Sequence, residues 1–89
     1  MTPTNPTISL AIAVYLDSVR LARSENTALT YRKALSTFAR VLEKHKLPPD
    51  EASIKELSEE AIVWLAKFMK DSAPSTERLY LTAVTGFYE

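Results

Sequence analysis

Polar side chains recur along residues 26 to 44 at the spacing of one face of an α-helix. At 100° per residue the set lies opposite the apolar side chains and contains no acid; its members are Asn26, Thr30, Lys33, Thr37, Arg40 and Lys44. Lysine and arginine bind phosphates, while hydroxyl and amide groups read base edges or add phosphate contacts. The pattern therefore fits a nucleic-acid-binding surface, and it also fits an ordinary solvated helix face.

The start of this segment, SENTALTYRKAL at residues 24 to 35, returns in altered form as APSTERLYLTAV at residues 73 to 84. The matched pairs are Thr27 with Thr76, Tyr31 with Tyr80, Ala34 with Ala83, Leu35 with Val84 and, one turn further on, Phe38 with Phe87. The second segment carries Arg78, Thr82 and Thr85 opposite its apolar residues, so it repeats the polar pattern more weakly. Because the match is brief, it indicates two similar helix beginnings in one domain and not a repeat array.

Both segments begin with residues that suit a helix N-terminus. Ser24 is placed to accept a hydrogen bond from the backbone N–H of Thr27, and Pro74 suits a first helical position. The free N–H groups and positive dipole end of a helix start favour phosphate, which adds Ser24, Thr27, Ser75 and Thr76 to the candidate contacts. Thr27 and Thr76 fall nearer the apolar side, so a structural role in the first turn is favoured for these two.

Catalytic and metal-binding patterns are absent from the sequence. His45 is the only histidine, cysteine is lacking, and no nucleophile–base or metal-ligand spacing accompanies His45. We therefore expect no catalytic residue, no cofactor and no metal site, and a surface position for His45. Trp64 and Phe68, four residues apart, fit a core aromatic pair; they would form a base-stacking pair only if exposed.

Length and charge set further bounds. A chain of 89 residues forms one small domain. Its net charge is zero, yet residues 18 to 46 hold seven bases against two acids, and residues 50 to 77 hold three bases against seven acids. We expect a molecule with one basic face and one acidic face. The lack of cysteine fits a reducing, cytoplasmic setting, and the apolar run at residues 8 to 16 is too short to span a membrane.

Helical periodicity dominates and predicts four helices, an all-α fold. The first runs from about Thr7 to Ala22, after a flexible tail at residues 1 to 7. Its apolar residues occupy nearly all sides, which predicts burial against more than one neighbour. The second follows Ser24, and a proline-interrupted connector at residues 46 to 53 separates it from the third.

Ser58 is the expected N-cap of the third helix, which Asp71 and Ser72 end, and Pro74 begins the fourth. The apolar faces of these helices converge on one predicted core. That core consists of Leu16, Val19, Tyr31, Leu35, Phe38, Leu42, Ile62, Leu65, Met69, Ala83, Val84 and Phe87.

Taken in order, these motifs resemble the N-terminal core-binding domain of tyrosine recombinases, the phage integrase family. The matching residues are Ser24, Asn26, Thr27, Tyr31, Arg32 and Leu35; Leu57 and Ser58; Pro74, Ser75 and Thr76; and Leu81, Thr82, Ala83, Val84, Phe87 and Tyr88. The resemblance covers roughly residues 8 to 89. It implies a small orthogonal bundle of four helices, of the SAM-like kind, that arches over DNA at a recombination site.

The resemblance also implies a function. The second and fourth helices would face double-stranded DNA, and other recombinase protomers would be partners in a synaptic complex. The catalytic arginine, histidine and tyrosine of the family belong to a second, C-terminal domain, so residues 1 to 89 would be a non-catalytic, monomeric fragment of a DNA integration and recombination enzyme. Family members carry a base where this chain has Thr85, and their domains are often net basic, which implies a weaker grip on DNA here.

The residues themselves leave a second function open. A helical module that binds another protein would use the surplus apolar surface of the first and fourth helices. DNA binding that weakens steeply with salt would distinguish the two functions.

Overall fold

The computed structural model describes residues 6–88, which form an all-α fold, as predicted. The elements are α1 (Ile8–Ala22), α2 (Glu25–Lys44), the 3-10 helix η1 (Ile54–Glu56), α3 (Glu60–Phe68) and α4 (Pro74–Tyr88). Within residues 6–88 no strand forms; an isolated β-bridge joins Thr7 to Ser53. The described part of the chain contains no helix with the length and apolarity needed to cross a membrane.

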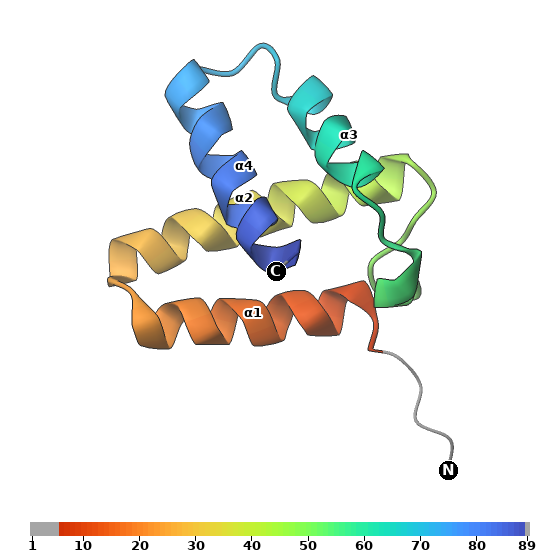
Figure 1. The fold of residues 1–89 in the computed structure, drawn as a ribbon, viewed down its shortest axis with the longest axis horizontal. Helices are drawn as coiled ribbons and strands as arrows, with labels where there is room; N and C mark the ends of the chain where they lie inside the picture. The colour runs from red at the N-terminus through yellow and green to blue at the C-terminus, as the bar shows by residue number, and fades with distance from the viewer. Residues whose placement is uncertain (1–5, 89) are drawn as a thin grey trace.

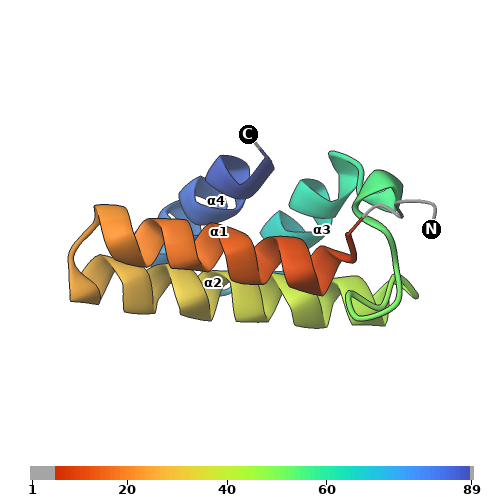
Figure 2. The same cartoon turned by 90° about the horizontal axis from the view of Figure 1, so that it is seen from below.

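The helix α2 forms one side of the bundle. Figure 1 shows α1 running antiparallel to α2, α4 crossing it, and α3 lying over its C-terminal half. Seen from below, α1, α3 and α4 all lie on the same side of α2 (Figure 2). Among the helices of residues 6–88, this arrangement leaves none to cover the opposite side of α2.

The repeated segments form the contact between α2 and α4. Ala34 and its counterpart Ala83 are fully buried, and so are Leu35 and Val84. The ring of Phe38 meets the ring of its counterpart Phe87 edge to face, with centroids 6.5 Å apart. These matched residues all lie in or pack against the one buried core, and the two phenylalanine rings join α2 to α4 directly. The repeat therefore reflects the packing of two helices against each other.

Most of the predicted core is buried. Val19, Tyr31, Leu35, Phe38, Leu42, Leu65, Met69, Ala83 and Val84 are buried, while Leu16, Ile62 and Phe87 are partly buried and pack against them. The buried cluster also contains Ile8, Ala34, Val41, Ala52 and Ala61, which the predicted core omitted. Small alanines and the residues at the ends of elements give a weaker periodic signal, because their burial depends on where the connecting segments pack.

The first helix matches its prediction only in part. Ile8 and Val19 are the buried residues of α1, and the outward residues Leu10, Val14 and Leu21 are exposed. Within residues 6–88, the main neighbour of α1 is α2. Tyr15 of α1 also meets α4, where its ring packs on Phe87, so burial against more than one neighbour is confirmed for that side of α1. The expectation is wrong for the outer stripe, which no second helix within residues 6–88 covers.

Hydrogen bonds tie the start of the described chain to the connector between α2 and α3. The Ile54 N–H donates to the Pro6 carbonyl at 3.0 Å, and the Ile8 N–H donates to the Ala52 carbonyl at 3.0 Å. The Thr7 side chain caps α1 by accepting from the Leu10 N–H. Pro6 and Thr7 thus belong to the folded domain and not to the predicted tail, whose residues 1 to 5 lie outside the described part of the chain.

Two of the predicted helix ends are confirmed and two are wrong. Ser24 caps α2 and α4 begins at Pro74, as expected. The N-cap of α3 is Glu59, not Ser58, and α3 ends at Phe68, before Asp71. The Ser58 carbonyl instead accepts a 2.5 Å hydrogen bond from the Tyr88 hydroxyl, which fixes the end of α4 to the start of α3.

The capping box of this region lies one turn earlier in the chain. Ser53 and Glu56 form it around η1: the Ser53 N–H donates to the Glu56 carboxylate at 2.8 Å. The S-x-x-E spacing from Ser53 to Glu56 is the sequence signal of a capping box. That signal would have located the 3-10 helix.

Candidate nucleic-acid interface

The polar set on α2 forms an exposed strip, here called the α2 strip: Asn26, Thr30, Lys33, Thr37, Arg40 and Lys44. Asn26, Lys33, Arg40 and Lys44 are exposed, and Thr30 and Thr37 are partly buried. The Thr30 hydroxyl donates to the Asn26 carbonyl at 3.0 Å, which leaves its lone pairs toward solvent. Within residues 6–88, neither Lys33 nor Arg40 forms an ion pair with an acid. Both cations are therefore available to an anionic partner.

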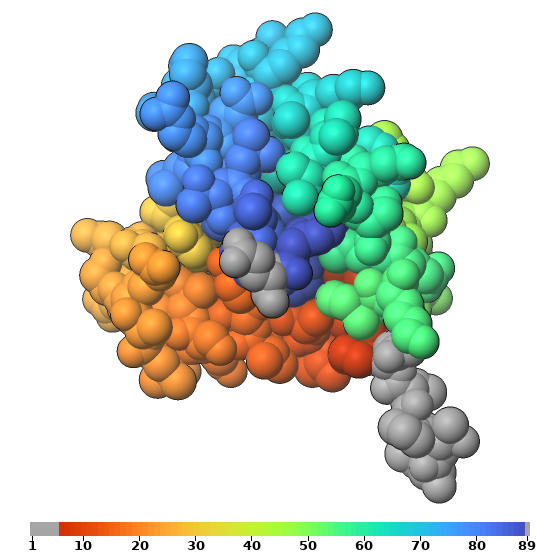
Figure 3. Space-filling view, in the orientation of Figure 1, coloured from red at the N-terminus to blue at the C-terminus, as the bar shows by residue number. Residues whose placement is uncertain are grey.

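The position of the α2 strip favours contact with a large ligand. The buried residues of α2, from Tyr31 to Leu42, point toward the other helices, and the strip points away from their centre. Figure 3 shows the face covered by α1, α3 and α4, on which only the ends of α2 are visible. A duplex approaching α2 from its uncovered side would meet no other helix first.

The start of α2 is held by two hydroxyls. Ser24 Oγ accepts from the Thr27 N–H at 3.3 Å and donates to Thr27 Oγ1 at 3.0 Å. Thr27 is partly buried and Ser24 is exposed. The structural role favoured for Thr27 matches this geometry, because both hydroxyls act within the first turn.

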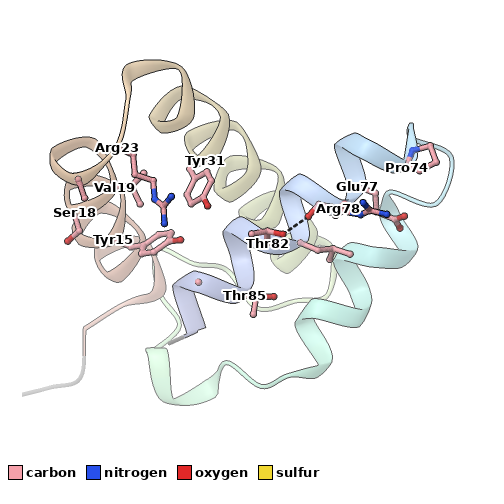
Figure 4. A pocket seen from close by; sticks show the side chains of 13 residues that line it. Tyr15, Ser18, Val19, Arg23, Tyr31, Pro74, Glu77, Arg78, Thr82 and Thr85 are labelled. Carbon is pink, nitrogen blue, oxygen red and sulfur yellow. Dashed lines mark hydrogen bonds between the residues drawn. The ribbon is translucent and has the colours of Figure 1, made fainter.

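The candidate residues of α4 do not lie with the α2 strip. Arg78, Thr82 and Thr85 line a groove of about 870 Å³ between α1 and α4 (Figure 4). The only α2 residue in its lining is Tyr31, from the buried side of that helix. Ser75 and Thr76 are exposed in the first turn of α4, outside this lining.

Polar groups in the groove make contacts that hold the helices together. The Tyr15 hydroxyl donates to the Ala83 carbonyl at 2.9 Å, and the Thr82 hydroxyl donates to the Arg78 carbonyl at 2.9 Å. The Arg23 guanidinium lies 5.9 Å from the centroid of the Tyr31 ring. The Tyr15 bond stabilises the α1–α4 contact, the Arg23–Tyr31 contact stabilises the turn between α1 and α2, and the Thr82 bond lies within α4.

The aromatic pair of α3 is divided between core and surface. Trp64 is partly buried and packs against the hydrophobic core, whereas Phe68 is 48% exposed, so the expectation of a core pair is wrong for Phe68. The core side of this short helix is formed by Ala61 and Leu65, which leaves Trp64 and Phe68 on the flank that meets the end of α2. His45 is exposed, as expected, and its ring stacks on Trp64 at 4.1 Å between centroids.

Charges divide between the layers of the fold. The basic stretch comprises the end of α1 and all of α2, whereas the acidic stretch comprises the connector, α3 and the start of α4. Within residues 6–88, no three histidine, aspartate or glutamate side chains come together as metal ligands would. An anionic partner therefore meets its most favourable potential at α2.

Comparison with known proteins found no matching family model, no matching curated protein and no matching solved structure. The function of this chain must therefore be inferred from its own residues.

Proposed function

We propose that this domain binds double-stranded DNA through the α2 strip, as a core-binding domain of a tyrosine recombinase would. The observation that carries the proposal is the exposed, acid-free strip on the side of α2 that no other helix covers. Solvent-exposed faces of α-helices usually carry both acids and bases, because opposite charges four residues apart stabilise the helix. Here the acids lie mainly on α3 and its flanking segments instead.

The chemistry of the strip suits a duplex. Lys33 and Arg40, two turns apart on α2, would each neutralise a phosphate. Asn26 and the Thr37 hydroxyl would lie in or beside the major groove, which has the width to admit an α-helix. Because few cations take part, binding would be weak, in the range of about 10⁻⁴ to 10⁻⁶ M typical of non-specific complexes.

The fourth helix contributes less to this proposal than its sequence implied. Arg78, Thr82 and Thr85 face the groove beside α1, so they do not extend the α2 strip. Ser75 and Thr76, at the exposed start of α4, are the residues of that helix left as candidates for a backbone contact.

The resemblance to tyrosine recombinases implies that residues 1 to 89 would bind DNA without catalysing strand cleavage or exchange. Tight binding would need a catalytic domain on the other side of the duplex, and recombinase protomers would be further partners. Residues 1 to 89 alone would be monomeric.

A second candidate function has one supporting observation. Leu10, Val14 and Leu21 form an exposed stripe on α1, and Leu21 is 84% exposed. Such a stripe suits a protein partner. Titration of duplex DNA at two salt concentrations separates the candidates, because only the proposed DNA-binding function predicts an affinity that falls with salt and requires Lys33 and Arg40.

A further inference from the structure

Two ring contacts join the end of α2 to α3. The His45 ring lies parallel to the Trp64 ring, with centroids 4.1 Å apart and 3° between the planes. Next to this pair, Lys44 Nζ lies 4.7 Å from the centroid of the Phe68 ring. Lys44 is the last residue of the α2 strip, so this aromatic cluster continues the strip onto α3.

The cluster offers aromatic faces to solvent. His45 is exposed although one face of its ring is covered by Trp64, so the other face remains accessible. Stacking on the indole fixes the orientation of that imidazole. Phe68 is 48% exposed, and the flexible side chain of Lys44 lies over its ring. Two accessible rings beside a cation are the components with which proteins bind unpaired bases and the adjoining phosphates.

Charge indicates the path that such a strand would take. On the α3 side, Glu60 lies four residues before Trp64, and Asp71, beyond the end of α3, lies three residues after Phe68; the exposed Lys67 and Lys70 lie beside Phe68. On the α2 side, Lys44 and Lys46 are both exposed. A phosphate backbone would therefore pass the lysines at the end of α2 and those beside Phe68, and its bases would point toward the rings.

We propose that His45, Trp64 and Phe68 form a stacking site for unpaired bases of single-stranded nucleic acid at the end of the α2 strip. This inference rests in part on the proposed function. The site would accept a base at the point where a bound duplex gives way to a single strand. Trp64 orients His45, Phe68 supplies a second ring, and Lys44 moves from the Phe68 ring to a phosphate.

The single tryptophan of the chain, Trp64, makes the proposal measurable by fluorescence. The probes are a blunt DNA duplex, the same duplex with a short single-stranded thymidine tail, and the tail alone. We expect the tailed duplex to bind at least about fivefold more tightly than the blunt duplex, since each stacked base adds a contact of this size. We also expect the tail to change Trp64 emission.

Matched variants separate stacking from simple apolar contact. Phe68→Leu keeps apolar bulk without an aromatic face, and Phe68→Tyr keeps the face. The tail preference should be lost in Phe68→Leu and in His45→Ala, and kept in Phe68→Tyr. Leu21→Ala, at a residue that is 84% exposed on α1, is the control for unrelated surface change.

Circular dichroism of each variant establishes that a lost preference does not reflect lost folding. Equal affinity for blunt and tailed duplexes with unchanged emission would overturn the stacking site, and so would a preference kept in Phe68→Leu. If the single strand binds and alters emission while blunt duplex does not bind, the stacking site stands and the duplex-binding function fails.

Discussion

The Tyr15 hydroxyl lies 2.6 Å from the position that a Cβ atom at Gly86 would occupy. That hydroxyl donates to the Ala83 carbonyl at 2.9 Å, and the Tyr15 ring packs edge to face on Phe87. Gly86, within α4, is the only glycine of the chain. A glycine inside a helix costs about 1 kcal/mol relative to alanine, and the close approach of α1 to α4 accounts for its presence here.

We predict opposite effects of Gly86→Ala in two backgrounds. In the wild type the new methyl group displaces the Tyr15 hydroxyl, and the domain loses stability. In Tyr15→Phe the hydroxyl is gone and the next atom, Tyr15 Cζ, lies at 3.6 Å, an ordinary contact. There Gly86→Ala should stabilise the domain by about 0.5 to 1 kcal/mol. Urea unfolding of the four proteins measures this double-mutant cycle, and equal effects in both backgrounds would contradict it.

Phe38→Ala should be among the most destabilising substitutions. Phe38 is fully buried and its ring meets Phe87 and Tyr88. Removing a buried phenyl ring leaves a cavity and costs about 3 to 5 kcal/mol. Thermal or urea unfolding should show this loss, with Leu21→Ala as a surface control changed by less than about 0.5 kcal/mol. A loss below about 1 kcal/mol for Phe38→Ala would place the ring outside the core.

Tyr88 should make the stability depend on alkaline pH. Burial, and to a lesser extent the negative charge of Glu59, raises the pKa of Tyr88 from 10.0 to about 12. Because the folded state holds this proton more tightly, its contribution is complete below about pH 10 and is lost as the pH rises toward about 12. The hydrogen bond from the Tyr88 hydroxyl to the Ser58 carbonyl also requires the proton.

The measurement compares urea midpoints of the wild type and Tyr88→Phe between pH 9 and 11. We expect the wild type to lose more stability than Tyr88→Phe over this interval. Parallel pH profiles of the two proteins would show that the pKa of Tyr88 does not differ between the folded and unfolded states.

Arg78 tests the separation of α4 from the α2 strip. Since Arg78 lines the groove beside α1, Arg78→Ala should leave the affinity for blunt duplex unchanged within about twofold. Lys33→Ala should weaken the affinity for duplex. It should also reduce the slope of the logarithm of the binding constant against the logarithm of the salt concentration by about 0.9. Fluorescence anisotropy with labelled duplex measures both. A larger effect of Arg78→Ala than of Lys33→Ala would place the duplex on the groove side.

Local chemistry allowed much of this fold to be predicted. Ser24 and Pro74 mark helix starts by their own hydrogen-bonding properties, and the periodic burial of Leu35, Phe38 and Leu42 follows from their spacing. The repeat was visible in the sequence, but its meaning was not. Only the fold shows that the matched residues Ala34 and Ala83 are both fully buried and that the matched rings of Phe38 and Phe87 meet where α2 and α4 cross.

The candidate site was less predictable, because it depends on how helices are placed relative to one another. Helical spacing put Arg78 and Thr82 on an exposed side of α4, yet it could not show that this side borders α1. Likewise, the spacing of Trp64 and Phe68 suited a core pair, and the exposure of Phe68 beside the end of α2 follows from the packing of α3.

The most direct test of DNA binding by the α2 strip is a salt titration. Blunt duplex is titrated at a series of salt concentrations with the wild type, with Lys33→Ala combined with Arg40→Ala, and with Lys55→Ala combined with Lys70→Ala. Both pairs remove two exposed lysine or arginine side chains, but only the first pair lies on α2. We expect wild-type affinity to fall with salt, and the log-log slope to drop by about 1.8 in the α2 pair alone, at about 0.9 for each lost phosphate contact. Equal losses in the two double variants, or no binding at low salt, would contradict the assignment of the α2 strip to DNA.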